Sequence, residues 1–341
     1  MRRLQGVSCR VIVAAWAALL FSGVATIEVQ AAETWASIFK STVQDFVADN
    51  SNRTLGGMQV WTDEFVFRGW RIQRNALTGH YRLLDAADRR QANGTYEECH
   101  ERFETLRTDL ALDPIKGRVV ILVHGMTGQR SDLRELAVLL KENCQLTTIE
   151  FGYASTRASL DDHAAALAKV VERLGPDVDH IDFVGFSMGN LVIRRYLFDH
   201  EDDRVQRFVM IGPPNQGAEL ANLWADHPLF LPVVGAATYQ MGPGWEHTVK
   251  KLAVPRCEFG IIAGCGGRPD GYSAKLPGDD DLVVSVATTR LAGAHDTVEL
   301  QSIHHFLPSH HRCREYVLRF LQKGHFITDE ERKPIAAEED Q

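Results

Sequence analysis

The chain has 341 residues, of which 45% are hydrophobic and 24% are charged. This is enough for one large domain or two small ones with an ordinary apolar core, and it excludes a mainly disordered chain. The 37 basic and 45 acidic residues give a formal net charge of −8, which argues against a nucleic-acid-binding surface because such a surface needs a basic stripe.

The first 31 residues have the order of a secretory signal peptide. Residues 1–10 hold three arginines and no acid, residues 11–27 carry no charge, and Val29-Gln30-Ala31 supplies a small-x-small cleavage site. We therefore expect cleavage near Ala31 and export to the periplasm or the medium. The alternative is a leader that is retained as a membrane anchor and brings the protein against a membrane surface, although the apolar stretch is short for a span.

Cysteine usage fits export only loosely. Cys9 would leave with the leader, and an odd number would remain: Cys99, Cys144, Cys257, Cys265 and Cys313. One or two disulfides and a free thiol are compatible with this number, and the pairing stays open. Cys257 and Cys265 are close enough in sequence to close a small loop, and no pair has the spacing of a metal site.

Residues 32–115 form an N-terminal extension whose structure the sequence leaves unclear. Residues 58–75 alternate apolar and polar side chains, which predicts one or two half-buried strands. Residues 95–110 place apolar side chains at helical spacing. We expect this extension to pack on the main domain.

Residues 116–325 have a regular pattern that predicts an α/β domain. Apolar runs alternate with amphipathic segments, as in a mostly parallel sheet with helices on both faces. The expected strands are 118–125, 146–153, 180–186, 207–214, 257–264 and 297–304, and the expected helices are 131–143, 159–175, 188–200 and 314–323. We expect Ser131 to cap the first of these helices. Residues 215–256 interrupt the alternation as an insertion that could form part of a lid, and residues 326–341 are a polar tail.

The run Gly185-Phe186-Ser187-Met188-Gly189 stands between an expected strand and an expected helix. So sharp a turn forces its serine into a strained backbone conformation and projects the hydroxyl above the sheet. The glycines remove side chains that would collide with the strand and the helix, and the helix N-terminus points amide donors at the serine. Ser187 is therefore a candidate nucleophile, and the alternative is an N-capping serine in a tight turn.

Acyl transfer also needs two donors for the oxyanion that forms in the transition state. The backbone N–H of Met188, directly after the candidate nucleophile, is one. The second is expected in the loop after the first core strand, residues 123–128, where the Met126 N–H is well placed. We expect His124 to orient this loop rather than to act as a base.

An acid and a base are expected after later strands. Asp281 directly precedes Leu-Val-Val, where the chain re-enters the core, so its carboxylate can be shielded and can hold a histidine. Its neighbours Asp279 and Asp280 are expected to be exposed. His304 or His305 would reach the site, whereas the two histidines at 310 and 311 open the C-terminal helix and are expected at the surface.

Taken together, these motifs resemble the α/β-hydrolase superfamily in its bacterial lipase and esterase branch. The matching runs are VHGMTG, GFSMGN, IGPPNQGAELA and DDLVVSVATTRL followed by IHHFL, within residues 118–323. The resemblance implies an α/β-hydrolase fold with a catalytic triad of Ser187, Asp281 and His304. Leu282 stands where this family usually has glycine, and the doubled histidine leaves His305 as an alternative base.

The implied function is hydrolysis of a small-molecule or lipid carboxylic ester by an esterase or lipase through an acyl-enzyme on Ser187. This chemistry requires no cofactor and no metal. Because a fold does not determine the substrate, an amidase, a thioesterase or an acyltransferase is the alternative within enzymes. Outside enzymes, the alternative is a catalytically inactive envelope binding protein.

Overall fold

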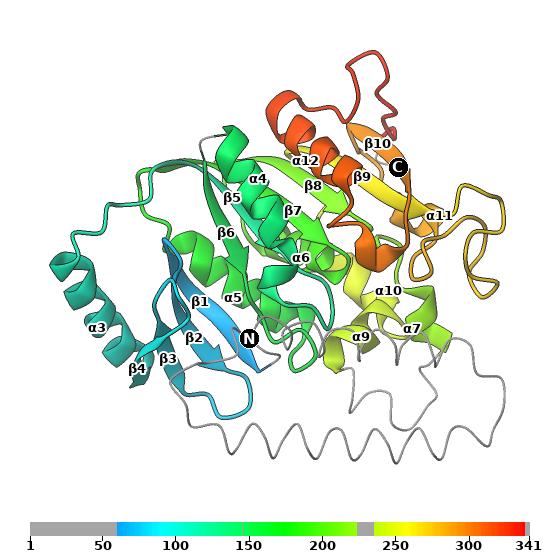
Figure 1. Ribbon diagram of the computed structural model, residues 1–341. Helices are drawn as coiled ribbons and strands as arrows, with labels where there is room; N and C mark the ends of the chain where they lie inside the picture. The colour runs from blue at the N-terminus through cyan, green and yellow to red at the C-terminus, as the bar shows by residue number, and fades with distance from the viewer. Residues whose placement is uncertain (1–59, 145, 224–234, 338–341) are drawn as a thin grey trace, which may run out of the picture. The chain divides into compact units, whose positions relative to one another are not determined.

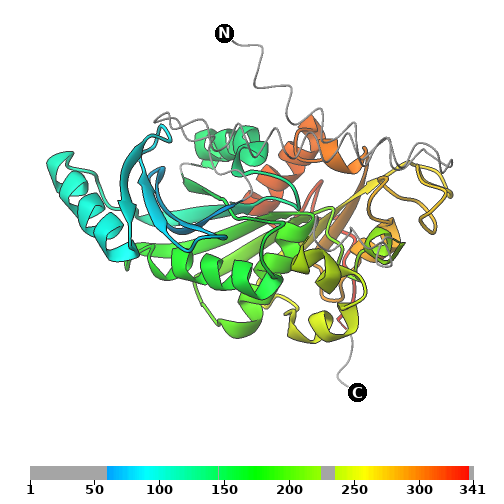
Figure 2. The same ribbon diagram turned by 90° about the horizontal axis from the view of Figure 1, so that it is seen from below.

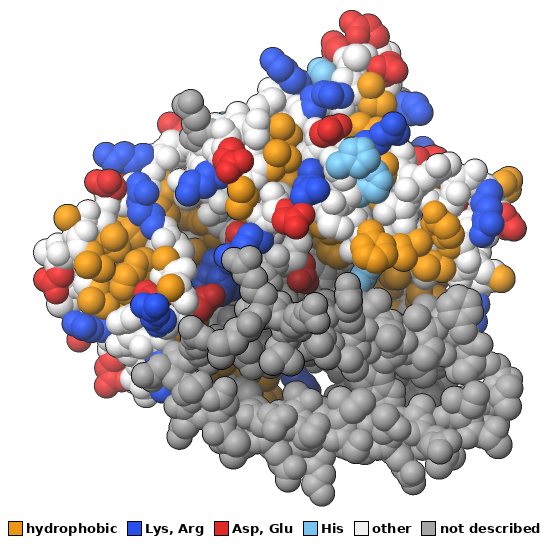
Figure 3. Space-filling view, in the orientation of Figure 1, with side chains coloured by type: hydrophobic (Ala, Val, Ile, Leu, Met, Phe, Trp, Pro, Cys, Tyr) orange, Lys and Arg blue, Asp and Glu red, His pale blue; other side chains and the backbone are white. Residues whose placement is uncertain are grey.

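The computed structural model describes residues 60–144, 146–223 and 235–337, which all belong to one compact unit, Arg53–Gln341. The expected signal peptide, the start of the extension and residues 224–234 of the expected lid lie outside these residues. Within the described part of the chain, no helix is both long enough and apolar enough to cross a membrane. On the described surface seen in Figure 3, basic and acidic side chains are interspersed.

The N-terminal extension contains a four-stranded antiparallel sheet, called here the added sheet. Its strands are β1 (Trp61–Phe67), β2 (Trp70–Asn75), β3 (Tyr81–Leu84) and β4 (Arg90–Gly94), paired in chain order (Figure 1). Helix α3 (Tyr96–Asp109) follows, begun by a capping box between Thr95 and Glu98. The expectation of half-buried strands is wrong for β1, which packs against the core helix α5 and contacts Phe103 of α3 through Phe65 and Phe67. All residues of β1 except Thr62 are buried.

The core is a six-stranded sheet in which every neighbouring pair is parallel (Figure 1). Its strands are β5 (Gly117–Val123), β6 (Thr147–Phe151), β7 (Val178–Phe186), β8 (Val205–Ile211), β9 (Glu258–Cys265) and β10 (Asp296–Gln301), in the order β10-β9-β8-β7-β5-β6. The structure confirms the predicted parallel sheet. Its carboxyl-end loops all leave at one edge, which is where ligand sites of such sheets lie.

Four long helices cover the two faces of this sheet, with α4 (Arg134–Cys144) and α12 (His311–Lys323) on one face and α5 (Leu160–Glu172) and α6 (Met188–Asp199) on the other (Figure 2). Alternating side chains of β5 serve both layers, because successive residues of a strand point to opposite faces. Val119 and Ile121 join the core cluster of α5 and α6, whereas Val120 and Leu122 join that of α4 and α12.

Two local expectations differ from the structure. The helix at 131–143 begins with a 3-10 turn, η1 (Arg130–Leu133), and its cap is Gln129 rather than Ser131, because the Asp132 carboxylate accepts the Gln129 N–H at 2.8 Å. All five described cysteines are free thiols. Cys257 directly precedes β9 and Cys265 is its last residue, so the extended strand separates their Cα atoms by about 26 Å, far beyond the ~7 Å that a disulfide allows.

The insertion between β8 and β9 contains short helices: α7 (Glu219–Leu223), α9 (Ala236–Met241), α10 (Trp245–Thr248) and η2 (Val249–Lys251). Its role as a lid stays a prediction. The described part of the tail runs beside β10, where the Asp296 carboxylate accepts the backbone N–H groups of Phe326 and Lys333.

Packing of α3 on the added sheet depends on Phe103. Its fully buried ring contacts the rings of Phe65, Phe67 and Trp70. We expect Phe103→Ala to lower the free energy of unfolding by about 3–5 kcal/mol, because it leaves a cavity. Leu110→Ala, at the end of the same helix and 55% exposed, should change it by less than about 0.5 kcal/mol. Urea unfolding followed by circular dichroism measures both, and equal losses would contradict this packing.

Candidate active site

Ser187 lies at the junction of β7 and α6 with φ 52° and ψ −125°. A non-glycine residue rarely takes a positive φ, so this is the strained turn that the sequence predicts. Hydrogen bonds stabilise this strained backbone conformation. The Ser187 N–H donates to the Ile211 carbonyl of β8 at 2.9 Å, and the Asn190 side-chain amide donates to the Ser187 carbonyl at 2.9 Å and to Ile211 at 3.1 Å. The sequence analysis gave Asn190 no role, although this residue directly follows the Gly-x-Ser-x-Gly run.

Gly189 lets the first turn of α6 lie against the end of β5. A Cβ at this position would be 2.2 Å from the Val123 carbonyl oxygen and 2.6 Å from that of His124. No side chain fits in that space, so the second glycine of the run is required by a backbone-to-backbone contact.

Asp281 and His304 are brought together from two neighbouring strands. Asp281 follows β9, and His304 opens the 3-10 helix η3 (His304–Phe306) after β10. His304 Nδ1 of the ring lies 2.7 Å from Asp281 Oδ2, and the backbone N–H of His304 donates to the backbone carbonyl of Asp281 at 2.8 Å. Asp281 is fully buried, and its other oxygen accepts the N–H groups of Val283 and Val284. The exposed His305 makes no such contact, so the structure pairs Asp281 with His304.

The His304 ring lies beside the turn that carries Ser187. Its centroid is 5.0 Å from that of Phe186, the residue before the serine. Gly212, directly after β8, lies so close that a Cβ there would be 3.0 Å from His304 Cε1. The second ring nitrogen, Nε2, is buried and forms no hydrogen bond to Ser187 or to any other described residue. The imidazole is thus oriented through Nδ1 by Asp281, whereas Nε2 has no hydrogen-bond partner among the described residues.

The acidic run before Asp281 is folded inward, and the expectation that Asp280 is exposed is wrong. Asp280 is fully buried and accepts the N–H groups of Ser273 and Leu282. Asp279 accepts three consecutive backbone N–H groups, those of residues 266–268. Backbone donors replace the water that these carboxylates give up. Leu282 has φ 81°, a backbone conformation that glycine adopts most easily. This agrees with the glycine that the family resemblance leads one to expect at this position.

The loop after β5 lies against Ser187. A Cβ on Gly125 would be 3.0 Å from Ser187 Cβ. Neither the Met126 N–H nor the Met188 N–H donates a hydrogen bond to another described residue. His124 is buried, burial lowers its pKa, and its Nδ1 lies 2.8 Å from the Gly125 carbonyl. A buried neutral imidazole engaged with its own loop fits the orienting role expected for His124.

The segment after β8, which contains the GPPNQG run, is fastened by Asn215. This buried side chain accepts a hydrogen bond from the Arg194 guanidinium at 3.0 Å and donates to the Thr289 carbonyl at 2.8 Å. Burial lowers the pKa of Arg194 to about 10. The segment is thereby tied both to α6 and to the chain that follows Asp281. The described residues include no group of three or more His, Cys, Asp or Glu side chains that could hold a metal ion.

The sequence model of the palmitoyl protein thioesterase family matches residues 119–243, from β5 to just past α9 and including the Ser187 turn. This chain has the α/β-hydrolase fold. Its parallel sheet and its strand-Ser187-helix turn are the elements that this fold shares. No curated protein matches this chain.

Solved structures similar to this chain include bacterial proteins. A Listeria innocua gene product has 21% identity and a TM-score of 0.46, over 66% of this chain and 99% of that one. Bacillus licheniformis lipase BlEst2 in mature form has 20% identity and a TM-score of 0.42, over 57% and 86%. Phospholipase PlaB from Legionella pneumophila has 15% identity and a TM-score of 0.45, over 60% and 58%.

Near the loop after β5, His163 of α5 is buried with its ring edge-on to Tyr153, the centroids 4.6 Å apart. Burial lowers the pKa of His163 to about 4; Asp162 opposes this shift and His124 adds to it. In an unfolded chain histidine titrates near pH 6.5. The folded protein therefore keeps His163 neutral across a pH range in which the unfolded chain takes up a proton.

Proton uptake by the unfolded chain does not lower the free energy of unfolding above pH 6.5. Below pH 6.5 it lowers this free energy progressively, until the loss levels off at about pH 4, where the folded protein also takes up the proton. We expect the wild type to lose as much as roughly 3 kcal/mol more of its free energy of unfolding over this range than His163→Gln. His311→Gln, at an exposed histidine, should behave like the wild type. Urea unfolding at pH 7 and pH 4.5 measures the difference, and an equal loss in His163→Gln would contradict it.

Proposed function

We propose that this protein is a serine hydrolase that cleaves carboxylic esters as an esterase or lipase. One observation carries the proposal: a buried Asp281–His304 pair presents an unengaged Nε2 beside the strained turn of Ser187. A carboxylate that holds one ring nitrogen prepares the other to accept a proton. The match to the palmitoyl protein thioesterase family model supports a hydrolase of this general type.

In the proposed reaction, His304 Nε2 takes the proton of the Ser187 hydroxyl as its oxygen attacks the ester carbonyl carbon. The N–H groups of Met126 and Met188 donate to the oxyanion of the tetrahedral intermediate. The C–O bond to the alcohol then breaks, and His304 returns the proton to the leaving oxygen. Water attacks the acyl-enzyme by the same route and releases the acid. Asp281 keeps its charge throughout and stabilises the imidazolium.

A thioester is the second candidate substrate, because the matching family model is that of a palmitoyl protein thioesterase. The same residues serve both reactions, since only the leaving atom changes from oxygen to sulfur. A thiol has a much lower pKa than an alcohol, so the thiolate depends less on the proton that His304 returns. Matched acyl esters and acyl thioesters of equal chain length separate the two candidates by kcat/KM.

Export is part of the proposal and rests on the basic, apolar and small-residue order of residues 1–31. Cleavage near Ala31 would release the hydrolase, and a retained leader would hold it at a membrane surface. N-terminal sequencing of the protein recovered from cell fractions distinguishes the two.

We expect Ser187→Ala and His304→Ala each to lower kcat by roughly 10⁴–10⁶-fold, because the triad acts as a unit. His305→Ala should keep kcat within a few-fold of the wild type. Hydrolysis of p-nitrophenyl esters measures these rates, and a fluorophosphonate probe should label the wild type but not Ser187→Ala.

Ser187→Ala with wild-type turnover would end the hydrolase proposal. Loss of activity in His305→Ala, with His304→Ala active, would move the base to His305. A folded wild type that neither turns over esters or thioesters nor reacts with the probe would favour an inactive binding protein.

A further inference from the structure

Residues 124–130, called here the oxyanion loop, are held by a short segment after β6. The Tyr153 hydroxyl donates to the His124 carbonyl at 2.6 Å, and its ring stacks on the His124 ring with centroids 4.3 Å apart. The Thr127 N–H donates to Ser155 Oγ at 3.1 Å. The hydrogen bonds at His124 and Thr127 therefore restrain the backbone on both sides of Met126.

The segment 152–155 is itself held by β1 of the added sheet. The Gly152 N–H donates to Asp63 Oδ2 at 2.7 Å, and the Asp63 N–H donates to the Gly152 carbonyl at 2.8 Å. The Ala154 N–H donates to Thr62 Oγ1 at 3.1 Å. Bonds from β1 therefore hold the residues on both sides of Tyr153.

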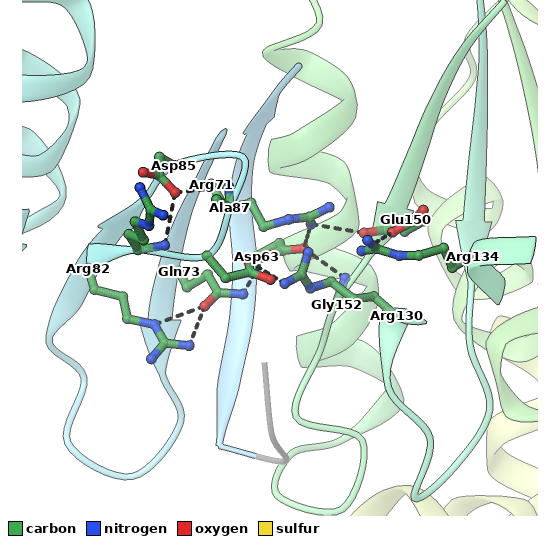
Figure 4. Close-up of polar contacts among 12 residues, drawn as sticks. Asp63, Arg71, Gln73, Arg82, Asp85, Ala87, Arg130, Arg134, Glu150 and Gly152 are labelled. Atoms are coloured by element: carbon green, nitrogen blue, oxygen red, sulfur yellow. Dashed lines mark hydrogen bonds and ion pairs between the residues drawn. The ribbon is translucent and has the colours of Figure 1, made fainter. Parts of the chain in front are cut away.

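Asp63 is the buried centre of this connection. It is fully buried, forms an ion pair with Arg71 of β2 and accepts the Gln73 side-chain amide at 2.7 Å. Figure 4 shows the Asp63 carboxylate among Arg71, Gln73 and Gly152, where the added sheet meets the core. Arg71 also donates to the Glu150 carbonyl of β6 at 2.9 Å. A buried carboxylate with this many donors is held in one position, because any shift would leave charge unpaired.

The far end of the oxyanion loop is tied to the same sheet. Arg130, at the end of the loop, is 6% exposed and pairs with Asp88. Asp88 lies in the turn between β3 and β4 and has φ 62°. The loop is thus connected to the added sheet at both ends, once through Tyr153 and once directly.

We propose that the added sheet positions the oxyanion loop, with Tyr153 and Asp63 as positioning residues that act through His124 and the Met126 N–H. This inference rests on the proposed function, because it assigns the sheet a role in the same reaction. Ser187, Asp281 and His304 all lie outside the added sheet. Its bonds through Thr62 and Asp63 reach instead the segment that holds the loop of the second oxyanion donor, and Asp88 pairs with that loop directly.

The first test is Tyr153→Phe, which removes the hydroxyl and keeps the ring between His124 and His163. Removing a whole oxyanion donor lowers kcat by about 10²–10³-fold, so misplacing one should cost roughly 10–100-fold. KM for a p-nitrophenyl ester should change by less than about three-fold, since the donor acts chiefly in the transition state. A trifluoromethyl ketone, which forms a tetrahedral adduct on Ser187, should bind more weakly by the same factor as kcat falls.

The matched control is Tyr196→Phe, at a buried tyrosine of α6 that packs on Phe183 and His200. It should keep both kcat and the ketone affinity. Thr62→Val removes the acceptor for the Ala154 N–H and should lower kcat in the same way. Because Thr62 and Tyr153 act through one segment, the double variant should lose less than the product of the single losses. Asp63→Asn should lower kcat if it folds, and Thr62→Val keeps the test decisive if it does not.

Wild-type kcat and ketone affinity in Tyr153→Phe would overturn the positioning role, as would a loss equal to that of Tyr196→Phe or a change confined to KM. This result is separable from failure of the proposed function. An inactive Ser187→Ala beside a fully active Tyr153→Phe removes only the positioning role, whereas an active Ser187→Ala removes the hydrolase itself.

Discussion

The backbone strain at Ser187 is the constraint on which the rest of the site depends. A residue at φ 52° costs on the order of 1–3 kcal/mol, and the surrounding structure must supply this energy. Asn190 and the Ile211 carbonyl supply hydrogen bonds, and Gly189 lets α6 approach β5. The same turn lies beside two parts of the candidate site: the His304 ring contacts Phe186, and Gly125 of the loop after β5 lies against Ser187.

The parallel sheet explains how residues far apart in the sequence reach one edge of the molecule. The loops after β5, β7, β9 and β10 carry Met126, Ser187, Asp281 and His304, and all leave the sheet at its carboxyl edge. Burial of Asp281 would be costly without partners, and the backbone N–H groups of Val283 and Val284 supply them. The acidic run before it is folded inward on the same principle, since Asp279 and Asp280 also accept backbone N–H groups.

The added sheet meets the core through charge as well as apolar packing. Phe65 and Val66 belong to one apolar cluster with Leu167 of α5, whereas Asp63, Arg71 and Arg130 are buried and ionisable. Buried ion pairs add little net stability compared with apolar side chains, but they tolerate only one arrangement of their partners. A single allowed arrangement, at little gain in stability, suits an interface that we propose positions the oxyanion loop.

The sequence by itself determined the parallel sheet, the covering helices and the turn at Ser187, because apolar periodicity and a Gly-x-Ser-x-Gly run are local signals. It also placed Asp281 and the histidine pair after the correct strands. Only the tertiary structure decided which histidine meets Asp281, that Asp280 is buried, and that both faces of β1 are covered. Each of these depends on partners that are not neighbours in the sequence, 89 positions apart for Asp63 and Gly152 and 7 positions apart for Asp280 and Ser273. Such contacts leave no pattern in the local sequence.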